Sequence, residues 1–363
     1  MSRVVYLHVG APKTGTTYLQ DRLGLNKAEL ARHGIDYPIG LHSTHFPAAL
    51  DLLGASWGGQ REKVRGEWEA LMGRVRRHSG TVVISHEILA GAKPHQIERA
   101  REDLQDSELH VVYSARDLGR QIPAEWQEGV KHRRRRSFAA FLKQVQNAPR
   151  SGSSMWFWRA QGLPDVLGRW TRGLPPSQVH LVTVPQSGAP RDLLWQRYCR
   201  VFGIDPAWAP AESARENVSI GAAEATLVRK LNGKLRQAGL PSDDYRKLIR
   251  DVVVHETLAH RPNMTKVSLP PEAMPWACQV AEEWVQWVAD AGIDVVGDVE
   301  DLRPVPLAPD QTWSNPDRPR RPDMVDAALD VMTALALEAA RRPDPDAQLM
   351  AKARRAARRL RRR

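Results

Sequence analysis

The sequence has few cysteines and no long apolar run, and these absences exclude several classes of protein. Only two cysteines, Cys199 and Cys278, occur among 363 residues, and neither has a partner at CxxC or histidine spacing. This pattern supports neither a disulfide framework nor a structural metal site. No stretch reaches the roughly 18 apolar residues of a membrane span, and the N-terminal apolar run is too short for a signal peptide. We therefore expect a cytoplasmic, metal-free protein.

The positive charge is distributed unevenly along the chain. The formal net charge is +11, but residues 351–363 contain eight basic residues and no acidic one, which leaves only +3 for residues 1–350. A strongly basic total often indicates a nucleic-acid or anionic-membrane partner. Because the body of the chain is almost balanced, we expect no specific nucleic acid and at most a weak contact between residues 351–363 and an anionic membrane. The oligomeric state cannot be predicted from these features.

Four short runs rich in β-branched residues stand out in the first two hundred residues. They cover residues 4–9, 81–85, 109–114 and 179–184, and patterns typical of helices lie between them. Nearly continuous apolar runs are typical of strands that are buried on both faces of a parallel sheet. The pattern predicts an α/β fold, a three-layer sandwich with a central parallel sheet of four to five strands; the loop after the first run, described below, makes a P-loop-type fold the expectation. No strand is expected after Gly203.

The spacing of apolar residues predicts helices in the remaining segments. These expected helices cover residues 17–25, 60–78, 94–103, 137–146, 163–171, 191–202, 222–238, 271–292 and 323–341. We expect an α/β domain over residues 1–302, with a core at 1–235 and a helical completion at 236–302. Six prolines between residues 303 and 322 indicate a linker or surface arm, and residues 323–363 form a helical, basic tail.

The segment HVGAPKTGTTYLQ directly follows the first predicted strand and opens a helix. In this context a glycine-bearing loop wraps a phosphate with its backbone N–H groups. Gly10 and Gly15 bracket the turn, as in the nucleoside-triphosphate loop GxxxxGK[ST], but Thr16 stands where that motif has its lysine. The lysine is at Lys13 instead, which argues against an ordinary magnesium-dependent kinase or ATPase.

The run from Pro12 to Thr17 resembles the 5′-phosphosulfate loop of sulfotransferases that use 3′-phosphoadenosine 5′-phosphosulfate (PAPS), usually PKSGTTW or PKTGTT. Pattern-level similarity to bacterial, particularly actinobacterial, members of this family extends over residues 1 to about 235. The resemblance implies that Lys13 is catalytic, that it acts on the leaving group, and that no metal is needed. It also implies a set of cofactor-binding residues in this loop: Gly10, Ala11, Pro12, Lys13, Thr14, Gly15, Thr16 and Thr17.

A second element follows the third predicted strand, in the segment VVYSARDLGRQIPAEWQEGVKH. Arg116 lies just past that strand and matches the arginine that holds the 3′-phosphate of PAPS in the family. The serine that helps it, about eight residues further on, is replaced here by Ala124. We expect Gln127 to supply the missing contact, with Gln121 and Lys131 as alternatives.

The catalytic base of the family is a histidine or a glutamate that takes the proton of the acceptor. Ser85, His86 and Glu87 stand at the end of the second predicted strand, where neighbouring side chains point to opposite faces. Glu87 is the preferred base because bacterial relatives use glutamate, and His86 is its rival. His42 and His45, in the segment LHSTHFP, remain further candidates.

These features together predict an enzyme, a PAPS-dependent sulfotransferase that moves a sulfuryl group to a hydroxyl or amine. The acceptor, whether a small molecule, a glycolipid or a carbohydrate, cannot be read from the sequence. A P-loop nucleotide-dependent kinase is the alternative enzyme. The alternative without catalysis is a nucleic-acid- or membrane-binding protein that acts through its basic tail.

Overall fold

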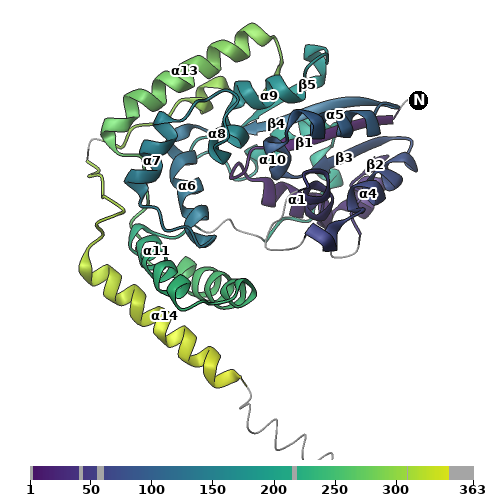
Figure 1. Cartoon of the computed structure of the whole chain (residues 1–363). Coiled ribbons are helices and arrows are strands. Elements are labelled where there is room, and N and C mark those ends of the chain that lie inside the picture. The colour runs from purple at the N-terminus through teal and green to yellow at the C-terminus, as the bar shows by residue number, and fades with distance from the viewer. Residues whose placement is uncertain (1–2, 41–43, 55–60, 215–218, 309, 343–363) are drawn as a thin grey trace, which may run out of the picture. The chain divides into compact units, whose positions relative to one another are not determined.

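The structure is a computed structural model that describes residues 3–40, 44–54, 61–214, 219–308 and 310–342 (Figure 1). The chain forms two compact units. The first, which we call the sheet unit, comprises residues 1–126, 138–217 and 268–313. The second, the helical unit, comprises residues 127–137, 218–267 and 314–363.

The sheet unit is built on six parallel strands in the order β2-β3-β1-β4-β5-β6. Neighbouring strands are in register, with Val5 opposite Val82 on one side and opposite Leu109 on the other. The first strand of the chain, β1, lies inside the sheet between β3 and β4. The bounds of the strands are β1 Arg3–Gly10, β2 Ile35–Asp36, β3 Thr81–Ser85, β4 Ser107–Ala115, β5 Val179–Thr183 and β6 Asp294–Val296.

The predicted α/β class and parallel sheet are confirmed, but two of the sequence expectations are wrong. The sheet has six strands rather than four to five, and β6 lies well beyond Gly203, where no strand was expected. Both missed strands, β2 and β6, lie at the edges of the sheet and have only 2 and 3 residues. Strands this short show no periodicity that a sequence pattern can detect.

Helices cover both faces of the sheet. Leu19 of α1, Leu30 of α2 and Phe202 of α10 are buried with Val83, Val112 and Val182 on one face. On the other face, the Tyr113 hydroxyl donates to the carbonyl of Ala160 in α8. The helices of the unit are α1 Thr16–Leu25, α2 Lys27–Arg32, α3 Phe46–Leu52, α4 Glu67–Arg76, α5 Pro94–Asp103, α7 Phe138–Asn147, α8 Trp156–Gln161, α9 Leu163–Trp170, α10 Leu193–Phe202 and α13 Met274–Ala291.

Short helical turns complete the sheet unit. In place of the single helix expected over residues 60–78, the turn η1 precedes α4, because Gly66 adopts a left-handed conformation (φ 88°) between them. The other turns are η2 Glu87–Gly91, η3 Pro176–Gln178, η4 Pro206–Trp208, η7 Pro271–Ala273 and η8 Val299–Leu302, with η1 at Arg61–Val64. Helix α6, Leu118–Lys131, begins in the sheet unit and continues into the helical unit.

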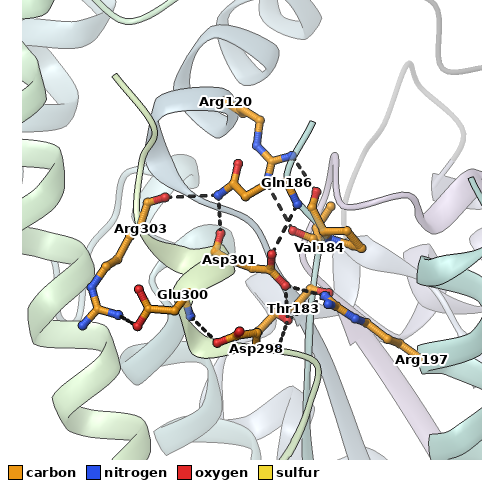
Figure 2. Close-up of polar contacts among 10 residues, drawn as sticks. Arg120, Thr183, Val184, Gln186, Arg197, Asp298, Glu300, Asp301 and Arg303 are labelled. Atoms are coloured by element: carbon orange, nitrogen blue, oxygen red, sulfur yellow. Dashed lines mark hydrogen bonds and ion pairs between the residues drawn. The ribbon is translucent and has the colours of Figure 1, made fainter. Parts of the chain in front are cut away.

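A polar network fixes the end of β5 against η8 and α10 (Figure 2). Its centre is the buried carboxylate of Asp301, which accepts from the Thr183 hydroxyl at 2.9 Å and from Arg197 at 2.5 Å. Gly297, in positive φ (130°), approaches so closely that a Cβ there would lie 2.1 Å from the Thr183 hydroxyl oxygen. Beside the network, Arg120 of α6 donates to the carbonyls of Val184 and Pro185. The residues that follow β5 are therefore held from three segments of the chain.

The helical unit has no strand within its described residues. Its elements are α11 Ala222–Gln237, α12 Ser242–Asp244, the π-helix η5 Tyr245–Thr257, the turn η6 Leu258–His260 and α14 Arg321–Arg341. Arg261 pairs with both Glu224 and Asp330 and so joins α11 to α14. Across the described ranges of both units, none of the helices combines the length and apolar character that a bilayer span requires.

Candidate active site

The candidate site residues follow three different strands, and they lie together at the carboxyl end of the sheet. Because the strands are parallel, the loop after β1, the turn η2 after β3 and Arg116 after β4 all lie at their carboxyl ends. From β1 the chain proceeds to β2 and β3 on one side, and from β4 it proceeds to β5 and β6 on the other. Ligands bind in parallel sheets at such a switch of direction, which here falls between β1 and β4.

The loop between β1 and α1 requires its two glycines. Gly10 has φ 134°, and a Cβ there would lie 3.0 Å from the Glu87 carbonyl oxygen; Gly15 has φ 85°. Lys13 also adopts positive φ (64°), which is uncommon for a residue with a side chain. Gly15 caps α1, and the first N–H groups of any α-helix have no acceptor within the helix. These N–H groups and the helix dipole favour an anion in front of the loop.

Buried hydroxyl and amide groups hold the loop in this conformation. The Thr14 hydroxyl donates to the Ala11 carbonyl at 2.5 Å, and the Ser114 hydroxyl, at the end of β4, donates to the Gly10 carbonyl at 2.9 Å. The Pro12 carbonyl accepts from the side-chain amides of Gln121 in α6 and Gln161 in α8. The loop is therefore held in this conformation by side chains from β4, α6 and α8.

His8 connects this loop to the end of β3. Its ring is fully buried in β1, with Nε2 3.1 Å from the Ser114 hydroxyl and Nδ1 2.8 Å from the Ser85 hydroxyl. Since Ser114 donates to Gly10, the consistent assignment is that neutral His8 donates from Nε2 and accepts at Nδ1. Burial lowers the pKa of His8 to about 4, so the ring is neutral near pH 7. Sequence reasoning missed this residue, although it is a polar side chain inside an apolar run.

Arg116 carries a half-buried positive charge beside the loop. One of its Nη atoms donates weakly to the Lys13 carbonyl at 3.4 Å, and its buried Nε has no hydrogen-bond acceptor among the described residues. Burial, followed by the charge of Arg120, lowers the pKa of Arg116 to about 10 despite nearby Asp117. Asp117 itself pairs with Arg120. A bound anion would stabilise the Arg116 guanidinium, which this environment otherwise destabilises.

Glu87 is the more accessible of the two rival bases. Its side chain is 24% exposed, and its Oε2 accepts from the Gln20 amide of α1 at 2.9 Å. Burial tends to raise the pKa of Glu87, but the His86 ring, a backbone N–H and Gln20 outweigh it and hold the pKa below its ordinary value. Glu87 is therefore a carboxylate near pH 7, and one of its oxygens is oriented by α1.

The histidine candidates are more constrained. His86 is buried, its ring lies tilted against that of Phe46, and its Nδ1 accepts from the Ile88 N–H as a cap of η2. Burial lowers the pKa of His86 despite the neighbouring Glu87. His45 is also buried, its Nδ1 accepts from the Ser85 N–H, and burial lowers its pKa to about 3. His42 lies outside the described residues.

The residues expected to assist Arg116 in binding the 3′-phosphate lie in different parts of the structure. Gln121 contacts the loop, but it donates to the Pro12 carbonyl. Gln127 belongs to the helical unit, where its side-chain amide donates to the Ile220 carbonyl at 2.6 Å, and Lys131 is buried in the same unit near Glu128. The role expected for Gln127 stays a prediction, and this hydrogen bond occupies one of the two N–H donors of its side-chain amide.

The loop residues expected to bind the cofactor lie together at the start of α1. Thr14 and Thr16 are buried, whereas Lys13 and Thr17 are partly exposed. Sequence reasoning missed Gln20 and Gln161 as neighbours of the site, since isolated glutamines in helices carry no motif. Within the described ranges, no group of three or more histidine, cysteine or acidic side chains is arranged to hold a metal ion.

Comparisons with protein-family models, with curated proteins and with solved structures found no match for this chain.

The buried neutral histidines predict a fold that loses stability in acid. Because the pKa values of His8 and His45 lie below their ordinary value of 6.5, the unfolded chain binds protons first as the pH falls. Each histidine should lower the free energy of unfolding by about 2 kcal/mol as the pH falls from 7 to 5. Urea unfolding followed by circular dichroism at several pH values measures this loss. His8→Gln should reduce the pH dependence, and an unchanged dependence in that variant would contradict the assignment of a neutral, buried His8.

Proposed function

We propose that the carboxyl end of the sheet binds PAPS and that the protein transfers the sulfuryl group of PAPS to a hydroxyl or amine. The observation that carries the proposal is the Arg116 guanidinium, half-buried beside the glycine-bracketed loop and opposed by the like charge of Arg120. Such a group is stabilised by an anion that binds beside it. The resemblance of residues 12–17 to the phosphosulfate loop supports PAPS as the source of that anion.

The residues fit the two anionic ends of this donor. The loop from Gly10 to Thr17 and the N-terminus of α1 offer backbone N–H groups and hydroxyls to the 5′-phosphosulfate. Arg116 follows the adjacent strand and offers its guanidinium group to the 3′-phosphate. The carbonyls of Gly10, Ala11 and Pro12 already accept hydrogen bonds from the protein. These negatively polarised oxygens are therefore directed away from the bound phosphosulfate.

The chain's own residues then serve a direct displacement at sulfur. PAPS, when bound, supplies a sulfuryl group attached to a phosphate that leaves as an anion. Lys13 lies in the phosphate loop, and its ammonium group neutralises the charge that develops on this leaving phosphate. Glu87, ionised near pH 7 and oriented by Gln20, takes the proton from the attacking hydroxyl or amine.

Glu87 is preferred over His86 because of what each already binds. The Nδ1 of His86 is engaged by the Ile88 N–H, and its ring is 8% exposed. Glu87 has three times that exposure and keeps an oxygen beyond the one that Gln20 contacts. The carboxylate therefore remains available to an acceptor.

A thermal-shift titration of the full chain tests the proposed donor. Adenosine 3′,5′-bisphosphate, without a metal, should stabilise the fold by about 2.7 kcal/mol at a hundredfold excess over its Kd. Stabilisation by ATP only when Mg²⁺ is present would instead indicate a kinase. Stabilisation by DNA alone, lost when salt is raised, would indicate a nucleic-acid-binding protein.

Arg116→Ala should reduce the affinity for adenosine 3′,5′-bisphosphate while leaving that for AMP almost unchanged. A charge-assisted hydrogen bond contributes about 1.5–3 kcal/mol, which corresponds to a loss of roughly 10- to 150-fold. Isothermal titration calorimetry with both nucleotides measures the selectivity, and Arg32→Ala, an exposed arginine of α2, is the control. Equal weakening of both nucleotides would show that Arg116 only supports the fold.

Glu87→Gln should abolish most of the turnover while retaining affinity for the bisphosphate, because the amide keeps the shape but takes no proton. We expect a decrease of roughly 10²- to 10⁴-fold in the release of bisphosphate from PAPS, measured with a mixture of phenols, alcohols and amines. His86→Gln should decrease this rate less. The opposite ranking of the two variants would assign the base to His86.

A further inference from the structure

A row of four polar side chains crosses β4, β5 and β6 toward the amino ends of these strands, away from the candidate active site. In its middle, Nδ1 of His110 lies 2.8 Å from Nε2 of His180. The outer nitrogen of each ring meets a carboxylate, since Nε2 of His110 lies 3.0 Å from Glu108 and Nδ1 of His180 lies 2.7 Å from Asp294. We call these four residues the histidine row.

The two imidazole rings of the row meet edge to edge. Their planes are 12° from parallel, and their centres are 5.1 Å apart. With the two nitrogens 2.8 Å apart, this is about the largest separation that the ring centres can reach, so both nitrogens lie on the line that joins the centres. This is the geometry of a linear N–H···N hydrogen bond rather than of two stacked faces.

The hydrogen bonds of the row fix the number of protons on the two rings. A carboxylate only accepts, so the contacts to Glu108 and Asp294 each use one N–H. The N···N contact uses one further N–H, because two lone pairs that face each other at this distance repel. Two imidazoles with three N–H groups carry one positive charge, which the carboxylates on both sides stabilise. The row is therefore complete only when His110 and His180 share one proton.

The surroundings resist a second proton on the rings. His180 is 7% exposed, and burial lowers its pKa against the opposing effect of Asp294, while the charge of the neighbouring ring lowers this pKa further. From β1, the Tyr6 phenol lies beside both rings. Burial raises the pKa of Tyr6, and the charges of Glu108 and Asp294 raise it further, so this phenol stays neutral.

The charged residues of the other elements packed on the row are directed elsewhere. Helix α10 places the Phe202 ring against Tyr6, whereas Arg197 of this helix pairs with Asp301 and its Arg200 is exposed. Turn η3 carries no charged side chain. The protons of the row are therefore governed by its own two rings and two carboxylates.

A metal ion between the rings does not fit this geometry. Histidine nitrogens bind zinc at about 2.0–2.1 Å, so an ion on the line between two facing nitrogens would hold them about 4 Å apart. The observed separation of 2.8 Å suits a shared proton.

We propose that the histidine row is a proton-dependent clamp that fastens the edge strand β6 to β5. Asp294 is the first of only three residues in β6, so its bond to His180 supplements a short ladder. When the strand is released, each histidine titrates with the ordinary pKa of about 6.5. Below this pH the released pair takes up the second proton that the clamp excludes, and above it the released pair loses the proton that the clamp requires. The clamp is therefore most stable near pH 6.5 and weakens on both sides.

Hydrogen–deuterium exchange of the full chain between pH 5 and pH 8, followed by mass spectrometry and corrected for the exchange of free amides, tests the clamp. Peptides that contain Asp294–Val296 should be most protected near pH 6.5, with protection roughly eightfold lower at pH 5 and at pH 8. Peptides from β1 and β3 report global unfolding. Their protection should fall steadily in acid, because of His8 and His45, without such a maximum.

Glutamine variants connect the maximum to the two rings. His110→Gln and His180→Gln each leave one titrating ring and should abolish the maximum at β6, whatever they do to its absolute protection. His33→Gln is the matched control and should keep it, since His33 also faces a carboxylate, Glu29 at 3.6 Å, but is exposed at the end of α2.

A wild-type β6 whose protection changes steadily across this pH range, or a maximum that survives both glutamine variants, would overturn the proposal. Protection of β6 by added Zn²⁺, reversed by a chelator and lost in both variants, would assign the two rings to a metal ion and overturn it as well.

Discussion

The candidate site depends on an electrostatic imbalance at the end of β4. Arg116 is half-buried near a second arginine, Arg120, and the adjacent carboxylate, Asp117, forms its ion pair with Arg120. Arg120 cannot move away, because it also holds the carbonyls that follow β5 (Figure 2). The same contacts that hold the residues after β5 therefore keep Arg120 beside Arg116, and the Arg116 charge stands next to the loop between β1 and α1 with its neighbouring carboxylate already paired. Such an arrangement favours an anion over a neutral ligand.

Sequence reasoning found the strands of the sheet centre because they are long and continuously apolar. It also placed Lys13 and Arg116 at the correct ends of β1 and β4, since a glycine-bearing loop and a charged residue directly after a strand are local signals. It could not find β2 and β6, whose 2 and 3 residues acquire strand geometry only by pairing with a longer neighbour. Nor could it find Gln20 or Gln161, which reach the site because helices far apart in the sequence pack around the loop.

The polar layer beneath the loop shows why the local motif alone does not specify the site. His8, Ser85 and Ser114 come from three strands and form hydrogen bonds with one another only when the strands are in the observed register. A slip of one residue would point these side chains to the opposite face. The conformation of the loop and the pairing of the sheet are therefore established together, and Glu87, two residues after Ser85, is positioned by the same register.

The pairing of β6 with β5 has a consequence for the chain as it is synthesised. β6 joins Val179–Thr183 from a position more than a hundred residues later, and His180 meets Asp294 across a separation of 114 residues. While the ribosome adds the residues between them, β5 presents an unpaired, apolar edge. Slow closure of such distant contacts leaves nascent chains open to association with one another. The stretch from Asp294 to Asp301 supplies both the last strand and the carboxylate of the β5 network. The sheet is therefore complete at β5 only after these residues have been synthesised.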